Sequence, residues 1–85
     1  MPYIPKEHRS RLSWWLQTDD LMPHNPGELN FVLTKILIRY IDNNGRNYST
    51  FNSVMGVLSC IGHELYRRFI GPYEDKKIEK NGDVL

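Results

Sequence analysis

The chain has 85 residues, of which 40% are apolar, 25% charged and 12% aromatic, and this composition excludes disordered and fibrous proteins. The net charge of +1 lacks the strong basic excess that usually accompanies nonspecific binding to nucleic acid or anionic membranes. The single cysteine, Cys60, excludes an intramolecular disulfide and falls short of a zinc-ligand set, which is in keeping with a cytoplasmic protein.

The length indicates one domain, residues 1–85, and a domain this small is only marginally stable alone. The first residues lack the basic segment and apolar run of a secretory signal. The longest apolar region, residues 29–41, is interrupted by polar side chains and is shorter than the roughly 20 residues that a membrane span needs. We therefore expect a cytoplasmic protein with no membrane segment.

The first predicted helix covers about residues 5–20, because Pro5 is tolerated in a first helical turn and apolar residues follow at helical spacing. Trp14 and Trp15 are adjacent, so both cannot face the same core. We expect one of them to pack inward and the other to cover a loop or lie in an interface. The turn-forming segment that contains Pro23 ends this helix.

The second predicted helix has a clear start: Asn25 is the N-cap, Pro26 takes the first helical position, and Glu28 completes a capping box. Gly45 is placed to end it. Its apolar residues extend over more than one face. They are Leu29, Phe31, Val32, Leu33, Ile36, Leu37, Ile38, Tyr40 and Ile41.

The third predicted helix begins at a cap formed by Ser49 or Thr50. Apolar residues then recur at three-four spacing, at Phe51, Val54, Met55, Leu58, Ile61, Leu65 and Phe69. Gly71 and Pro72 are expected to break or kink the helix, and a short further helix starts at Pro72 and closes at Gly82. The fold class is therefore all-α: a small bundle of three main helices with a short C-terminal helical extension.

Three segments of the sequence, residues 1–7, 27–35 and 72–84, resemble an uncharacterised family of small proteins from bacteria, their phages and marine environmental sequences. The likeness extends over nearly the full length. It implies an all-helical fold, and it carries over no activity, cofactor or catalytic residue.

The C-terminal acidic residues Glu74, Asp75, Glu79 and Asp83 are candidate metal ligands, because grouped carboxylates can hold magnesium and position a nucleotide phosphate. The ending from Glu79 onward resembles part of the acidic motif of MazG-type nucleotide pyrophosphohydrolases. The second pair of acids in that motif is absent here, since Glu64 stands alone. A metal-dependent hydrolase is thus one alternative function, and a solvated helix with acid–lysine pairs is the favoured reading.

A second polar cluster has groups that could bind an anion or transfer a proton. It consists of His63, Glu64, Tyr66, Arg67 and Arg68. No nucleophilic side chain accompanies them at a spacing that is typical of a catalytic site. We favour structural pairing, for example between Glu64 and Arg68 four residues later.

Basic residues near the C-terminus, Arg67, Arg68, Lys76 and Lys77, are candidate contacts for an anion or for nucleic acid, with Tyr73 able to stack on a base. This makes a nucleic-acid-binding accessory protein the other alternative function. The interspersed acidic residues would cancel much of the positive field, so nucleic acid is not the favoured partner.

The favoured partner is a second copy of the chain, because the second helix is apolar over more of its circumference than two neighbouring helices can cover. We expect a homo-oligomer, in the simplest case a two-fold dimer, formed through the second and third helices. The expected interface residues are Trp14, Phe31, Ile38, Gly56, Cys60 and His63. The sequence thus predicts a homo-oligomeric binding or interaction protein in a phage or bacterial setting, rather than an enzyme, with no cofactor.

Overall fold

The computed structural model describes residues 2–17 and 22–85. Helical structure accounts for 81% of the chain, and no strand occurs in the described residues, so the predicted all-α class is confirmed. The elements are η1 (Lys6–His8), α1 (Arg9–Ser13), η2 (Trp14–Gln17), α2 (Pro26–Asn44), α3 (Tyr48–Leu65), η4 (Tyr66–Ile70) and α4 (Gly71–Asn81).

The N-terminal helix is shorter and less regular than predicted. Lys6 to Gln17 form two 3₁₀ turns around the five-residue α1, and the predicted positions 18–20 lie outside the described residues. Trp15 is half-buried, and its indole Nε1–H donates a hydrogen bond to the Leu12 carbonyl oxygen at 3.0 Å. Trp14 is 66% exposed, so the two neighbouring tryptophans face different surroundings.

Helix α2 begins as its sequence predicts. The Asn25 side chain caps the helix by accepting a hydrogen bond from the Glu28 backbone N–H at 2.9 Å, and Pro26 occupies the first turn. The Glu28 carboxylate reaches one residue further back than in a capping box, because it accepts from the His24 N–H at 2.9 Å. Gly45 ends the helix at a φ of 108°, a left-handed backbone that glycine adopts without strain.

The start of α3 corrects a prediction. The N-cap is Asn47 rather than Ser49 or Thr50, and its side chain accepts a hydrogen bond from the Thr50 N–H at 2.9 Å. Asn47 has the extended backbone of a cap, whereas Ser49 already lies in the first helical turn. The connection between α2 and α3 is therefore very short, which holds the two helices as a hairpin.

Helices α3 and α4 are joined through η4 into one continuous helix of 34 residues. The predicted break or kink at Gly71 and Pro72 takes the form of a π turn just before them, in which the Gly71 N–H donates to the Tyr66 carbonyl. This wider turn accommodates Pro72, which has no N–H to donate and whose ring crowds the preceding turn. The helix then ends at Asn81, before Gly82 at a φ of 90°, as predicted.

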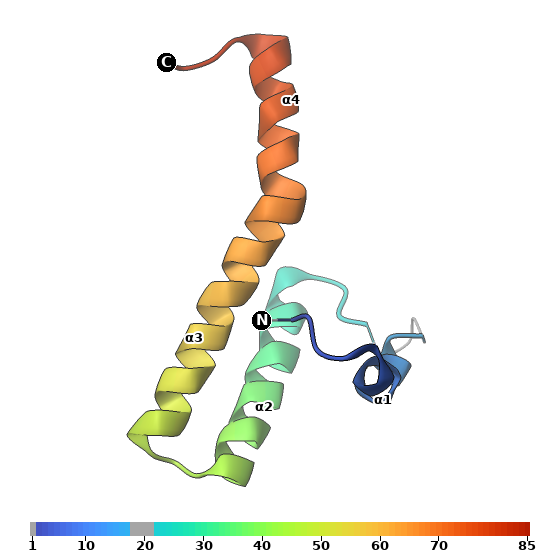
Figure 1. Ribbon diagram of the computed structural model, residues 1–85, viewed down its shortest axis with the longest axis vertical. Coiled ribbons are helices and arrows are strands. Elements are labelled where there is room, and N and C mark those ends of the chain that lie inside the picture. Colours follow the sequence, from blue (N-terminus) through green and yellow to red (C-terminus); the bar gives the residue numbers. More distant parts are fainter. Residues whose placement is uncertain (1, 18–21) are drawn as a thin grey trace.

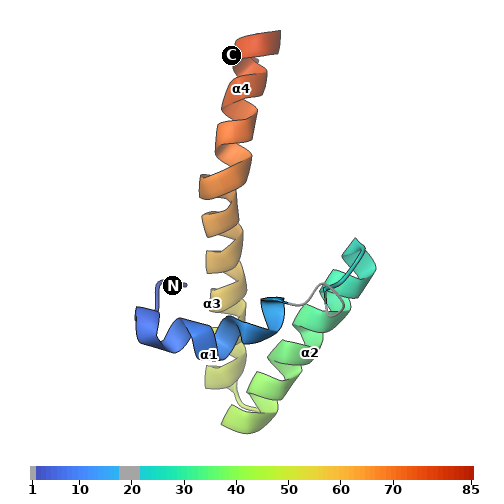
Figure 2. The same ribbon diagram turned by 90° about the vertical axis from the view of Figure 1, so that its right-hand side faces the viewer.

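The two helices of the hairpin run in opposite directions and diverge from their connection, while α4 projects beyond the hairpin (Figures 1 and 2). Thr50 and Val54, close to the connection, are the only buried residues among those described. The radius of gyration is 16.8 Å, against about 12 Å for a compact domain of this length. No helix in the described part of the chain combines the length and apolarity that crossing a membrane requires.

Candidate functional site

The most extensive candidate site is the apolar surface of the α2–α3 hairpin. The chain exposes 7859 Å² of accessible surface, whereas a compact monomer of its mass exposes about 5,300 Å². The hairpin residues that are large, apolar and exposed are Leu29, Phe31, Leu33, Ile36, Ile38, Tyr40, Tyr48, Phe51, Met55, Val57, Leu58, Ile61 and Leu65. Three of them, Ile36, Tyr40 and Val57, line a pocket between α2 and α3, so the hairpin does not bury its own apolar stripes.

The side chains that the sequence predicts for an interface all lie on the surface. On α2, Phe31 is 62% exposed and Ile38, seven residues later, lies on the same face of the helix. On α3, Gly56, Cys60 and His63 are exposed and share another face. Trp14, 66% exposed, lies on η2 and belongs to neither helix. These residues are accessible to a partner, and they form more than one surface.

Gly56 and Gly62, which lie about 120° apart around α3, both leave room for close approach. A Cβ atom built on Gly56 or Gly62 would meet no atom within 4 Å apart from its own helix backbone and chain neighbours. Small side chains on an exposed helix allow a second helix to pack at short distance. Between the two glycines, Pro2 of the N-terminal segment lines a small apolar pocket with Val57, Cys60 and Ile61, so the open positions of α3 are the glycines themselves.

The polar cluster around Glu64 ties the N-terminal segment to the long helix. The Tyr3 hydroxyl donates a hydrogen bond to the Glu64 carboxylate, and Arg67 Nη2 lies 3.1 Å from the same carboxylate and 3.0 Å from the Tyr3 oxygen. Arg68 Nε lies 4.0 Å from Glu64, so the expected pairing with Arg68 is present and the one with Arg67 is closer. Tyr3 is the member of this cluster that the sequence did not single out, because it is 61 residues away from Glu64.

Electrostatics in this cluster follow from those contacts. The hydrogen bond from Tyr3 is the largest cause that lowers the pKa of Glu64, partial burial opposes it, and Arg67 adds to the lowering. The same carboxylate raises the pKa of Arg67. Both groups are thus held in their charged forms, which is typical of a structural ion pair rather than of an acid poised to exchange a proton.

The C-terminal candidate metal ligands are spread over different surroundings. The Glu74 carboxylate accepts a hydrogen bond from the Tyr66 hydroxyl at 3.0 Å, and this contact raises the pKa of Tyr66. Helix α4 ends at Asn81, so Asp83 lies beyond it and accepts instead from the Leu85 N–H at 3.0 Å. Within residues 2–17 and 22–85, no three acidic, histidine or cysteine side chains are grouped closely enough to hold a metal ion.

The basic residues that are candidate contacts for an anion or nucleic acid also lie in two different surroundings. Arg67 and Arg68 lie beside Glu64, which offsets part of their charge. Lys76 and Lys77 lie on the exposed surface of α4, where the Lys77 ammonium is 5.5 Å from the centre of the Tyr73 ring. The structure therefore gathers these four residues along one end of the long helix without forming a single positive surface.

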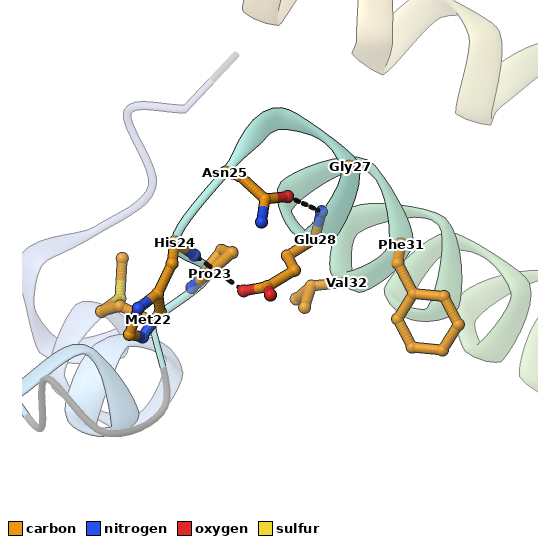
Figure 3. A pocket seen from close by; sticks show the side chains of 8 residues that line it. All are labelled: Met22, Pro23, His24, Asn25, Gly27, Glu28, Phe31 and Val32. Atoms are coloured by element: carbon orange, nitrogen blue, oxygen red, sulfur yellow. Dashed lines mark hydrogen bonds between the residues drawn. The ribbon is translucent and has the colours of Figure 1, made fainter.

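A surface hollow of about 570 Å³ lies at the start of α2, and the sequence did not predict it. Its lining consists of Met22, Pro23, His24, Asn25, Gly27, Glu28, Phe31 and Val32 (Figure 3). The Asn25 amide oxygen and the Glu28 carboxylate, which line it, each accept a backbone hydrogen bond at the start of α2. The hollow is thus explained by the turn that precedes the helix, and the Pro23–Pro26 pattern is the sequence signal for that turn.

Comparison with known proteins identifies the family and no function. Residues 1–84 match the family described as Domain of unknown function (DUF6899), and the chain belongs to that family. Neither a curated protein nor a solved structure matches the chain.

Proposed function

We propose that the chain is a small homo-oligomeric binding or interaction protein, in its simplest form a two-fold dimer. In this proposal the α2–α3 hairpin is one part of a helical bundle that a second copy completes. A cytoplasmic location and a bacterial or phage setting belong to the same proposal.

The observation that carries this proposal is the exposed area. The accessible surface of 7859 Å² exceeds that of a compact monomer by about 2,600 Å². A standard protein interface buries about 800 Å² per partner, and obligate homodimers bury about 1,000–2,500 Å² per partner. The excess is therefore of the size that an obligate dimer removes from water.

The packing within one chain supports the same proposal. Val54 is the only buried apolar residue of the described part of the chain. Complete burial of such a side chain contributes about 1.5–3 kcal/mol, while ordering the backbone of each residue costs about 1–2 kcal/mol. Further apolar burial must come from another surface, and an identical hairpin offers one of matching size and character.

A two-fold arrangement is the simplest form of this assembly. One self-complementary surface on each copy closes the assembly, because each contact made by one copy is made again by the other. A head-to-tail arrangement that does not close into a ring would leave an apolar surface exposed at each end. The proposal therefore predicts a discrete mass and not a growing series.

Light scattering after size exclusion tests the proposal. At tens of micromolar we expect a single species of twice the chain mass, with the helical circular-dichroism signal intact. A monodisperse monomer that retains this signal under the same conditions would contradict the proposed function.

A further inference from the structure

We call the C-terminal part of the long helix, residues 66–81 in η4 and α4, the arm; within the described residues its contact with a distant part of the chain is the hydrogen bond from Arg67 to Tyr3, close to the start of the arm. Among the described residues α4 packs only against η4, and it projects beyond the hairpin (Figures 1 and 2). Phe69 is 69% exposed and Tyr73 60% exposed. A helix of this length is marginal in water without tertiary packing, so its apolar side indicates a missing partner.

The π turn keeps the apolar stripe of α3 continuous with the arm. Residues spaced four apart drift by about 40° around an α-helix, so a stripe that runs on through Leu65, Phe69 and Tyr73 would rotate away from the face that contacts α2. The π turn at Tyr66–Ile70 contains an extra residue, which turns the later positions back. Phe69 and Tyr73 therefore continue the stripe beyond the reach of α2.

An apolar groove suited to one aromatic ring lies on the hairpin. It has a volume of about 180 Å³, and a cavity of about 150 Å³ lined by aliphatic side chains is large enough to bind benzene. Its lining comes from both helices and consists of Ile36, Leu37, Tyr40, Val54 and Val57. The two helices that supply this lining diverge from their connection (Figure 2).

We propose that, in the dimer, the arm of each copy lies against the α2–α3 hairpin of the other, with Phe69 in the groove of the partner. This inference rests on the proposed function and names the surface that performs it. Phe69 fits an apolar groove because it has no polar group to desolvate, whereas Tyr73 carries a hydroxyl group. The occupant is thus a second copy of this chain, because each copy supplies both the inserted Phe69 side chain and the groove that receives it.

Two-fold symmetry gives this arrangement a checkable geometry. If Phe69 contacts the partner's helix at the level of Val54 and Val57, the two long helices run antiparallel and cross near Gly62, which is midway between them. Gly62 is open, since a Cβ there would meet no neighbouring atom within 4 Å, and it allows the helices to approach closely. The exchange is reciprocal, so it covers both arms and both grooves, in keeping with the large area that the chain exposes.

Disulfide trapping tests the placement of the arm. In a Cys60→Ser background, Phe69→Cys is combined with Val57→Cys, and the protein is oxidised at a concentration where light scattering reports a dimer. The two positions of one chain lie about 18 Å apart along the helix, too far for a disulfide, which needs Cα atoms within about 7 Å. Any disulfide between them must therefore join two chains.

We expect the double variant to form a covalent dimer on a non-reducing gel in most of the protein. The matched controls are the two single variants, Phe69→Cys and Val57→Cys. Copies of each single cysteine would lie about 15–21 Å apart across the two-fold axis, so we expect no linkage above the background of random collision. If Val57→Cys impairs the helical signal, Tyr40→Cys replaces it as the partner of Phe69→Cys.

The outcomes separate this inference from the proposed function. A dimer by light scattering in which neither cysteine pair becomes linked overturns the placement of the arm and leaves the dimer intact. Linkage of Phe69→Cys alone means that the arms pair with each other, and this also overturns the placement. A monomer before oxidation overturns both.

Discussion

The two termini of the long helix are both well capped, and they differ strongly in packing. At its start, Asn47 caps the helix, and Thr50 and Val54 are buried against α2. At its end, α4 closes as cleanly at Gly82, yet Phe69 and Tyr73 lie in solvent. The local signals of a helix are thus complete at both ends, while among the described residues a buried side chain is found at only one of them.

This difference separates what a helix needs to begin and end from what it needs to be stable. Capping groups and glycine termini are satisfied by neighbours in the sequence. Burial of an apolar face requires a surface from elsewhere, and most helical stability in proteins comes from that burial. The start of α3 obtains its partner from the same chain, and we have proposed that the arm obtains it from another.

The largest expected effect is at the packed end. Val54→Asp places an uncompensated charge in the buried position and should cost about 3–5 kcal/mol of folding free energy, measured by chemical denaturation followed by circular dichroism. Ser53→Asp, an exposed neighbour on the same helix, is the control and should change stability little. Equal effects of the two substitutions would mean that this end is not where the chain is held together.

The open face of α3 provides the next test. A Cβ atom at Gly56 would meet no atom of another part of the described structure within 4 Å, and replacing glycine in a helix interior favours the helix by up to about 1 kcal/mol. Gly56→Leu should therefore leave each chain folded and overpack the contact between chains, weakening assembly by about 1–3 kcal/mol.

The dimer dissociation constant, measured by sedimentation or by light scattering on dilution, reports this change. Gly56→Ala is the control, because it adds only one methyl group. Unchanged assembly in Gly56→Leu would exclude this face of α3 from the interface and leave the arm as the remaining candidate contact.

The fold could be predicted from the sequence where the signals are local. Asn25, Pro26 and Gly45 fix both ends of α2 through contacts with residues close in the chain, and the prediction is confirmed there. The cap of α3 was misplaced because Asn47, Ser49 and Thr50 are all acceptable capping residues. The choice among them depends on how short the connection to α2 can be, which is a tertiary condition.

The candidate site was less predictable because its contacts are distant in sequence or lie outside the chain. The pairing of Glu64 with Arg68 follows from helical spacing, but its contact with Tyr3 spans most of the chain. The hypothesis that the C-terminal acidic residues form a metal site requires the helix to continue past Gly82, but α4 ends at Asn81. The interface residues remain a prediction, since only a second copy can test them.

A smaller difference in stability is expected between substitutions at the two termini of the long helix, Asn47 and Gly82. Asn47→Ala removes the hydrogen bond to the Thr50 N–H and should cost about 1 kcal/mol of global stability. Gly82→Ala strains a residue at a φ of 90°, but it should fray only the end of the arm and leave the melting temperature nearly unchanged. Asn52→Ala, an exposed position inside α3, is the control for the asparagine substitution. Equal losses for Asn47→Ala and Gly82→Ala would place the arm within the same cooperative unit as the hairpin.

The smallest expected effect is on the titration of Glu64, at the junction between the packed and the unpacked halves of the long helix. The Tyr3 hydroxyl, and after it Arg67, holds the pKa of this carboxyl below its ordinary value. A carboxyl group with a lowered pKa stabilises the fold fully above its unfolded-state pKa, and it loses that contribution as the pH falls through the lowered value. The attachment of the N-terminal segment should therefore persist at neutral pH and weaken only in acid.

Tyr3→Phe removes the hydroxyl that is the first cause of this shift and keeps the ring. We expect the pKa of Glu64, followed by NMR of its side-chain carboxyl carbon, to rise toward the ordinary value in this variant, because only Arg67 and Arg68 then favour its charged form. Asp42 is an internal control in the same sample, since its pKa is lowered by Arg46 at 2.8 Å and owes nothing to Tyr3. An identical Glu64 titration in the two proteins would mean that Tyr3 does not reach the long helix in solution, and the N-terminal segment would then join the arm as a part of the chain whose partner lies elsewhere.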